Sequence, residues 1–330
     1  MASDTPGSLQ PYLIEIIITL IIVSMKKKKL FYTLLVALMC TSCATPNFTQ
    51  YAMSDFYNLP KPGVGGYQGM AIYKDYLVSL QNGGVATIYR LPDMQVVTPT
   101  FKLASAHSRN HSNVGAFGVE RGHKDDLLPV LYVSQCHRKL IRGMKDACFV
   151  ERLLPEGKSE LLQTIILDDD QKLFGYALQW TVDSKNKRLI GFGNTLKGED
   201  ANNRFRVIVF PLPKLADGKE IHLRPEDAIE NYLLQDYTQA YPARIIGQGA
   251  CVYGDRLVMP TGFGNKEWPS VLYVWGMKHK RMERVVDLST ELKAEMEDVD
   301  FYKGEAYVQT NGRGIVKFKF GKRAAAGSAR

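Results

Sequence analysis

The stretch QGMAIYKDYLVSL, residues 68–80, recurs along this chain. QGACVYGDRLVMP, residues 248–260, aligns with it without a gap, and EDVDFYKGEAYVQ, residues 297–309, keeps the same register. Looser copies begin at Asn113 and near Gln179. A unit repeated at a period of tens of residues is typical of radial or solenoid arrays. The repeat therefore decides the fold class before any single residue is considered.

Each unit predicts short β-strands. The copy itself spans two apolar runs, and a third follows after a polar turn: VATIYRL, CFVERLL, RFRVIVFPL, VLYVWGM and GIVKFKF. These runs are rich in Val, Ile, Tyr and Phe and are bounded by Gly, Asn, Asp or Pro, as strands are. A fourth run closes most units. Four antiparallel strands in each of five units predict an all-β, five-bladed β-propeller.

The ends of the repeat predict how the ring closes. The last unit stops after its third strand, at Phe320, and lacks an outer strand. Residues 47–58, NFTQYAMSDFYN, have the length and composition of the missing strand, so we expect them to pair beside residues 314–320 and leave no bare edge. The extra segments PEGKSE, DDDQKLFGYA and LADGKEIHLRPED are predicted to be loop insertions on one rim.

Composition and charge exclude several classes of protein. The 330 residues are 45% hydrophobic and 10% aromatic, which is ordinary for a globular protein with a substantial core. The formal charge of +8 comes largely from residues 26–29 and from the C-terminal tail, which leaves about +3 on the part predicted to fold. This charge is too small to predict nucleic-acid binding.

The N-terminal region has the layout of an export signal. Met25 and four lysines precede the apolar run LFYTLLVALM, which is followed by Cys40, Thr41, Ser42 and Cys43. With cysteine at the cleavage point, this segment resembles a bacterial lipoprotein signal of the type common in Bacteroides-like bacteria. The resemblance implies lipidation of Cys43 and attachment to the outer membrane, on a periplasmic or surface face. Cys40 departs from the pattern, which usually has Leu there.

These boundaries divide the chain into four parts. Residues 1–24 are predicted to be an upstream extension, with a longer, unusual anchor as the alternative. Residues 25–43 form the signal, residues 44–320 a single propeller domain, and residues 321–330 a loose tail. From about Cys43 to Phe320 the chain resembles the propeller lipoproteins of Bacteroides-like bacteria, a family that does not fix a ligand.

Two cysteines predict a cross-strand disulfide. Cys136 and Cys148 lie at symmetric distances from a proposed turn near Gly143, so their strands would face each other. Closing a loop of this size would stabilise the fold by roughly 2 to 3 kcal/mol. The alternative is a pair of reduced, half-buried thiols. Cys251 takes the place of Ala71 in the aligned units and is predicted to be a small core residue.

Propellers bind ligands at the mouth of the central funnel, where the inner strands begin. The positions predicted there are Gln68, Asn113, Gln179, Gln248 and Glu297. Propellers that cut glycosidic bonds need two carboxylates, and an amide cannot exchange a proton near neutral pH. The similarity to glycosidase propellers is thus one of architecture. Amides suit a neutral polyhydroxylated ligand such as a glycan, or they tie neighbouring blades together.

A second candidate is the segment SAHSRNHSN, residues 105–113. His107, Arg109, His111 and Asn113 occupy alternate positions and would share one face of an extended run. Such a face could bind an anion, for instance a uronate or phosphate. A metal usually has three or four protein ligands, so neither a metal nor a cofactor is predicted. A polar loop with local hydrogen bonds is the alternative.

The sequence thus favours a lipid-anchored, non-enzymatic recognition protein that binds a glycan at the funnel mouth. The alternative is a lyase or hydrolase acting on an acidic sugar, with Glu297 or His111 as the base and Arg109 holding the substrate carboxylate. A scaffold for protein partners is a third possibility. Trp180 and Trp268 could stack on sugar rings, although tryptophan in a propeller more often packs between blades.

Overall fold

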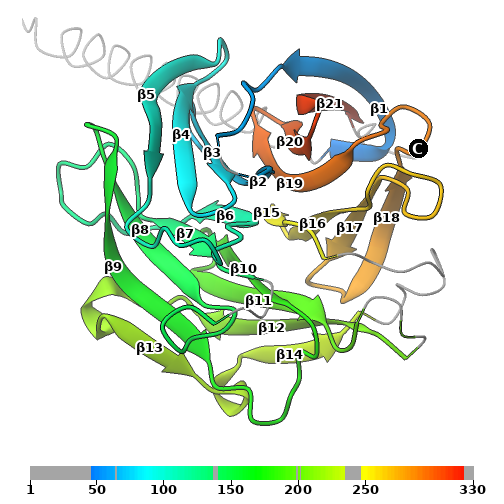
Figure 1. Cartoon of the computed structure of the whole chain (residues 1–330). Helices are drawn as coiled ribbons and strands as arrows, with labels where there is room; N and C mark the ends of the chain where they lie inside the picture. The colour runs from blue at the N-terminus through cyan, green and yellow to red at the C-terminus, as the bar shows by residue number, and fades with distance from the viewer. Residues whose placement is uncertain are drawn as a thin grey trace, which may run out of the picture. The chain divides into compact units, whose positions relative to one another are not determined.

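The computed structural model describes residues 46–63, 65–136, 140–197, 200, 202–234 and 247–322. Within them the chain forms five sheets around a central axis (Figure 1). Each sheet is a blade that runs from an inner strand at the axis to an outer strand at the rim. The prediction of an all-β, five-bladed propeller is confirmed.

The strands follow the repeat in chain order. Blade 1 contains β2 (Tyr67–Tyr73), β3 (Tyr76–Gln81), β4 (Val85–Arg90) and β5 (Gln95–Lys102). Blade 2 contains β6 (Val114–Phe117), β7 (Leu131–Ser134), β8 (Cys148–Leu154), β9 (Lys158–Leu167) and β13 (Glu220–Leu223). Blade 3 contains β10 (Leu178–Asp183), β11 (Arg188–Asn194), β12 (Phe205–Pro211) and β14 (Glu230–Leu233). Blade 4 contains β15 (Cys251–Tyr253), β16 (Arg256–Thr261), β17 (Val271–Gly276) and β18 (Arg281–Asp287). Blade 5 contains β19 (Glu295–Tyr302), β20 (Glu305–Asn311), β21 (Gly314–Lys322) and β1 (Pro46–Tyr57).

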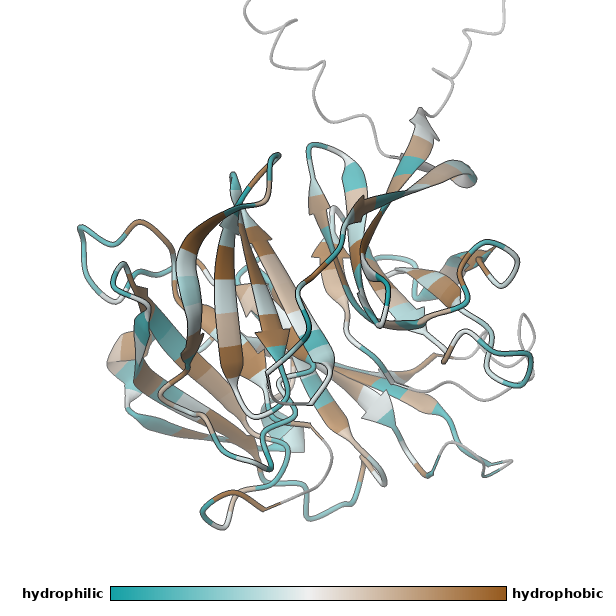
Figure 2. Ribbon diagram, turned by 45° about the horizontal axis from the view of Figure 1, so that its top comes forward, coloured by the Kyte–Doolittle hydropathy of each residue, from teal (hydrophilic) through white to brown (hydrophobic). Residues whose placement is uncertain are grey.

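The hydrophobic core lies in the gaps between neighbouring blades. Five separate clusters of buried side chains each join two adjacent blades, so every blade shares a core with both neighbours. In the gap between blades 2 and 3, Trp180 and Phe210 pack with Tyr132. Hydrophobic and polar residues alternate along many strands (Figure 2), as expected where successive side chains point to opposite faces. Burial in these five gaps holds the ring together, at roughly 1.5–3 kcal/mol for each fully buried large side chain.

The N-terminal strand closes the ring as predicted. Strand β1 pairs with β21 as the outer strand of blade 5, whose other strands come from the C-terminal end of the described chain (Figure 1). The rings of Phe48 and Phe320 pack with their centroids 4.7 Å apart. Arg313 Nε also donates to Asp55 Oδ1 at 2.8 Å. Blade 5 therefore joins the two ends of the described chain in one sheet.

The glycines of the repeat let the inner strands approach closely. Gly69 N donates to Ser112 O at 2.9 Å, which joins blade 1 to blade 2. Gly249 N donates to Glu297 O at 2.6 Å, which joins blade 4 to blade 5. A Cβ on Gly69 would lie 2.6 Å from Ser112 O, closer than real Cβ atoms come. The Gln-Gly pair in the repeat is thus needed where backbones meet at the axis.

Gly249→Ala is expected to destabilise the propeller by about 1–3 kcal/mol, the usual cost of overpacking a tight site. A Cβ at this position would overlap the carboxylate of Asp298, which is itself fixed by hydrogen bonds. Urea unfolding followed by circular dichroism measures the change. Gly63→Ala is the matched control, because nothing lies within 4 Å of a Cβ there. Equal unfolding midpoints for the two variants would contradict the packing argument.

One predicted loop insertion is partly regular structure. The segment LADGKEIHLRPED contains two short 3₁₀ turns, η1 (Leu215–Asp217) and η2 (Pro225–Asp227), with β13 between them. β13 leaves blade 3 and pairs in parallel with β9 of blade 2, with His222 opposite Ile166. The sequence missed this strand because it is short and both its neighbours are turns. It adds a fifth strand to blade 2 and spans the outer part of the gap between two blades.

Candidate functional site

The leading residues of the five inner strands are all buried at the axis. Their side chains are at most 5% exposed: Gln68, Asn113, Gln179, Gln248 and Glu297. Inner strands β2, β6, β10, β15 and β19 follow one another around the ring (Figure 1), so the buried residues that lead into them belong to neighbouring strands at the axis. Whether they bind a ligand stays a prediction.

Most of these ring side chains keep a buried polar atom that has no hydrogen-bond partner among the described residues. The atoms are Gln68 Oε1, both side-chain polar atoms of Asn113, Gln179 Oε1 and Glu297 Oε1. Gln179 uses its Nε2 to donate to Gly247 O at 2.6 Å, across to the segment that leads into blade 4. Gln179 therefore ties two blades together with its Nε2 and leaves its Oε1 unused, whereas neither polar atom of the Asn113 side chain has a partner among the described residues.

A second carboxylate, which the sequence analysis missed, lies beside Glu297. Glu295 starts β19 two residues earlier, and its carboxylate accepts a hydrogen bond from Gln248 Nε2 at 2.9 Å. Burial, and then the neighbouring Glu295, raise the pKa of Glu297 well above its usual range. The two carboxyl groups are close enough to share a hydrogen bond, and Gln68 also bonds to Glu297. The pairing of β19 with β20 shifts register between Met296 and Asp298, so simple alternation did not predict that the two carboxyl groups meet.

The other two acids of this segment stabilise the fold. Asp298 Oδ2 accepts from Met70 N at 2.8 Å and from Gly115 N at 3.1 Å, and its Oδ1 accepts from Val299 N. Asp300 Oδ2 accepts from Ile72 N at 2.6 Å, and burial raises the pKa of Asp300 to about 7. These carboxylates clamp blade 5 to blades 1 and 2 and do not supply acid to the mouth.

The histidine-rich segment does not form one binding face. Two turns interrupt residues 105–113, closed by Ala106 N to Leu103 O and by Asn110 N to His107 O, so the segment is not an extended strand. The side chains separate as a result. His111 Nδ1 meets Asn82 Oδ1 at 2.6 Å, whereas Arg109 donates to Leu140 O at 3.1 Å. No group of three or more metal-ligating side chains occurs in the described part of the chain.

The predicted disulfide does not form in the structure: Cys136 and Cys148 are not joined to each other, and both are buried. The strand register gives the reason, since Ser134, not Cys136, lies opposite Cys148. Cys136 falls beyond the end of β7, has a positive φ of 52°, and accepts a hydrogen bond from Gln179 Nε2 at 3.5 Å. The predicted pairing of Cys136 with Cys148 is therefore two residues out of register.

We expect the denatured, non-reduced fragment from residue 44 onward to expose three reactive thiols, because Cys136, Cys148 and Cys251 are all free. Titration with a chromogenic disulfide reagent counts them. A count of one would show that the bridge forms despite the register. The same titration on the native protein should be slow, since all three side chains are buried.

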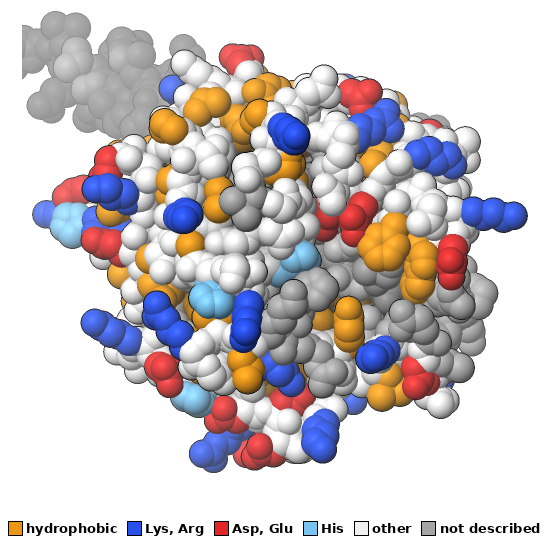
Figure 3. Space-filling model, in the orientation of Figure 1, with side chains coloured by type: hydrophobic (Ala, Val, Ile, Leu, Met, Phe, Trp, Pro, Cys, Tyr) orange, Lys and Arg blue, Asp and Glu red, His pale blue; other side chains and the backbone are white. Residues whose placement is uncertain are grey.

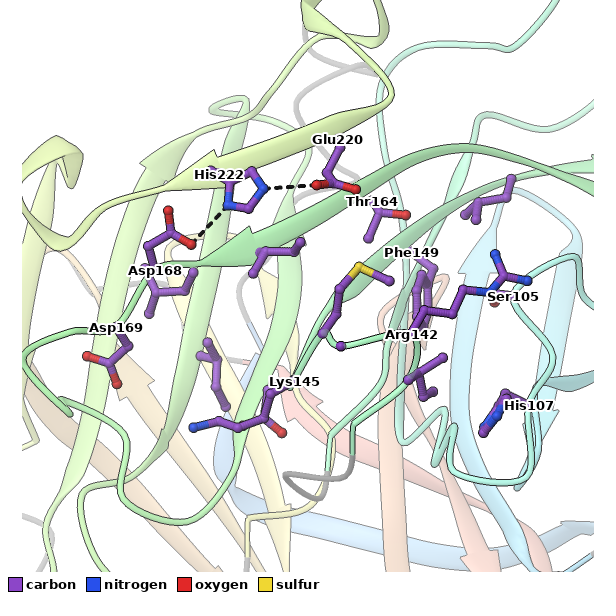
Figure 4. A pocket seen from close by; sticks show the side chains of 18 of the residues that line it. Ser105, His107, Arg142, Lys145, Phe149, Thr164, Asp168, Asp169, Glu220 and His222 are labelled. Carbon is purple, nitrogen blue, oxygen red and sulfur yellow. Dashed lines mark hydrogen bonds and ion pairs between the residues drawn. The ribbon is translucent and has the colours of Figure 1, made fainter.

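A cavity of about 650 Å³ lies on the rim between blades 2 and 3 (Figure 4). We call it the rim pocket. It is lined by the β5–β6 loop at Ser105–His107, by the β7–β8 turn at Ile141–Asp146, by the end of β9 with the following residues, and by β13. Of the predicted ligand-binding residues, only His107 lines it.

His222 is fixed on one wall of the rim pocket. Its Nδ1 meets Asp168 Oδ1 at 2.9 Å and its Nε2 meets Glu220 Oε1 at 3.0 Å (Figure 4). These two hydrogen-bonded carboxylates raise the pKa of His222. The signal for these residues in the sequence was the pair of insertions, DDDQKLFGYA and LADGKEIHLRPED, which carry all three side chains.

Comparison with family models and with curated protein sequences found no match. Among solved structures, the tail fibre of Staphylococcus aureus phage P68 superposes with a TM-score of 0.51 at 10% identity, covering 82% of this chain and 53% of the fibre. This chain thus spans about half of the fibre's length. A Myxococcus xanthus glutaminyl cyclase gives a TM-score of 0.49 at 8% identity over 83% of this chain and 98% of the cyclase. At such low identity these similarities concern the fold alone.

Proposed function

We propose that this chain is a recognition propeller whose funnel mouth binds a neutral polyhydroxylated ligand of the glycan class. The observation that carries the proposal is the set of buried, unpartnered polar atoms on the leading residues of the inner strands. A buried polar atom without a partner costs about 1–3 kcal/mol. Ligand hydroxyl groups, which both donate and accept, would offset that cost at several positions together.

The charge distribution supports a neutral ligand. Lys, Arg, Asp and Glu side chains are scattered around the face shown in Figure 3 and form no large patch of one sign. Amide groups dominate the ring, and they carry no charge. A strongly anionic ligand would meet Glu295 and Glu297 at the mouth.

An aromatic pair beside blade 5 supports a sugar ligand in particular. Phe263 is 43% exposed, and its ring packs edge-on to Trp268 with centroids 6.0 Å apart. Phe263 lines a shallow groove together with Glu295 and Asn311. An exposed, fixed ring next to hydrogen-bonding groups matches the two faces of a pyranose, which has apolar C–H groups and polar edges.

The glycosidase alternative is less well supported by the same residues. Retaining glycosidases hold their carboxyl groups about 5–5.5 Å apart, and inverting enzymes hold them further apart. Glu295 and Glu297 interact with each other, and this interaction helps to raise the pKa of Glu297. His111 and Arg109, the other predicted catalytic groups, are bonded to Asn82 and Leu140. These residues therefore support a binding role better than they support hydrolysis or lyase chemistry.

The proposal includes export and a lipid anchor on Cys43, which rest on the signal-like segment of residues 25–43. Among the described residues, no helix has the length and apolar character needed to cross a bilayer. Radiolabelled palmitate should enter the full-length chain in a bacterial host and should not enter the Cys43→Ala variant. Equal labelling of the two would overturn the anchor without affecting the binding proposal.

Calorimetric titration of residues 44–330 with neutral plant and host oligosaccharides tests the binding role. We expect saturable binding of at least one of them, weakened about tenfold or more by Gln179→Leu. Gln95→Leu, on the exposed outer strand of blade 1, is the control and should leave affinity unchanged. No binding across the panel, or equal affinity of both variants, would refute the proposed site.

A further inference from the structure

Three departures from the repeat meet at the rim pocket. A plain blade needs four strands and short turns, and three of the segments that exceed this plan are the long β7–β8 connection, the residues after β9, and the insertion that contains β13. All three line the rim pocket, through Arg142 and Lys145, Asp168 and Phe174, and Glu220 and His222. Because closing the ring requires none of them, a function other than folding best explains their convergence.

The rim pocket combines an apolar floor with charged walls. Its floor is made of Phe149, Leu161, Ile166 and Phe174 from β8, β9 and the segment after β9. A volume of about 650 Å³ falls within the range of small-molecule sites, which are mostly apolar with a few polar groups at the edge. The floor therefore suits an apolar side chain, and the charged residues of the walls determine which class of ligand bears that side chain.

The two walls carry opposite charges. Asp168 and Glu220 lie on one side, each with one oxygen bonded to His222 and the other free of that bond (Figure 4). Arg142 and Lys145 lie on the β7–β8 turn, with the side chain of Arg142 pointing toward Ser105 and that of Lys145 pointing toward Asp169 (Figure 4). The carboxylate of Asp169, in contrast, already accepts hydrogen bonds from two backbone groups, Leu173 N and Phe174 N.

We propose that the rim pocket binds a short zwitterionic peptide with an apolar side chain. Asp168 or Glu220 would accept hydrogen bonds from the peptide's ammonium group, and Lys145 would pair with its carboxylate. The apolar side chain would lie on the floor formed by Phe149 and Leu161. This site is separate from the funnel mouth and does not depend on the function proposed there.

Calorimetry with leucyl-leucine and two blocked forms tests each charge of the proposed ligand. We expect saturable binding of leucyl-leucine, and binding weaker by about tenfold or more for both N-acetyl-leucyl-leucine and leucyl-leucinamide. Lys145→Met should weaken the binding of leucyl-leucine. It should leave the affinity for leucyl-leucinamide unchanged, because the amide lacks the carboxylate. Lys185→Met, an exposed lysine in the β10–β11 turn, is the matched control and should change neither.

Three results would overturn the proposal: no saturable heat from leucyl-leucine or trileucine, equal affinity for free and blocked peptides, or an unaltered affinity in Lys145→Met. Loss of affinity on amidation alone would show an anion site and refute the zwitterion. Gln179→Leu, the funnel variant, should bind leucyl-leucine as the parent chain does. That comparison separates a failure of the rim pocket from a failure of the funnel site.

Discussion

Asp298→Ala is expected to destabilise the propeller by at least about 3 kcal/mol, the largest single effect on stability in this chain. The substitution leaves three buried backbone donors without an acceptor: Met70 N, Gly115 N and Val299 N. Each unpaired donor costs about 1–3 kcal/mol of stability. The donors belong to three different blades. Loss of the carboxylate therefore loosens the ring at its axis as well as removing local bonds.

Urea unfolding of Asp298→Ala, Asp298→Asn and Asp55→Ala measures this effect. Asparagine retains one oxygen, which can still serve Met70 and Gly115, so its loss of stability should be intermediate. Asp55 pairs with Arg313 at the surface, where an ion pair is worth about 1 kcal/mol or less. If Asp298→Ala unfolds at the same urea concentration as Asp55→Ala, the carboxylate does not clamp the blades.

The fold was predictable because its rules are local and repeat. Gln68 and Gln248 begin aligned units, and the glycines that follow them are explained by the close approach of backbones at the axis. The missing outer strand in the last unit predicted the pairing of β1 with β21. Each of these inferences needed only strand length, alternation and turn residues. Parallel pairing of β13 with β9 has no such local signal, because it depends on where two insertions meet in space.

The candidate site was less predictable because strand register and loop turns decide it. A shift of two residues in the β7–β8 register moved Cys136 away from Cys148 and left both thiols free. Two turns interrupt residues 105–113, so the alternate spacing of His107 and His111 does not place them on one face of a strand. Alternation predicts a shared face only within a strand. Glu295 was not predicted beside Glu297 because the strand shifts register between Met296 and Asp298, which alternation cannot foresee.

Glu297→Gln is expected to leave glycan affinity within about threefold of the parent chain at pH 7, while an enzyme using Glu297 as a proton donor or base would lose turnover by about 10²–10⁴-fold. Burial and the nearby Glu295 raise the pKa of Glu297 and so favour its neutral form, which glutamine, also a neutral donor, resembles. Calorimetry gives the affinity, and release of reducing ends or unsaturated products gives turnover. Glu297→Leu, which removes the polar group, should weaken binding.

The same substitution should alter how stability depends on pH. The pKa of Glu297 is raised in the folded chain, so above the unfolded value of about 4.3 the folded state binds one proton more than the unfolded state. Stability from this group is complete below that value and falls as pH rises, by up to about 1.4 kcal/mol per unit, until the raised pKa is passed. Glu297→Gln cannot titrate and should show a shallower decline between pH 5 and 7 in urea unfolding. An unchanged slope would mean that Glu297 is already ionised in the folded protein, and a charged Glu295–Glu297 pair would then favour a cationic ligand over a neutral glycan.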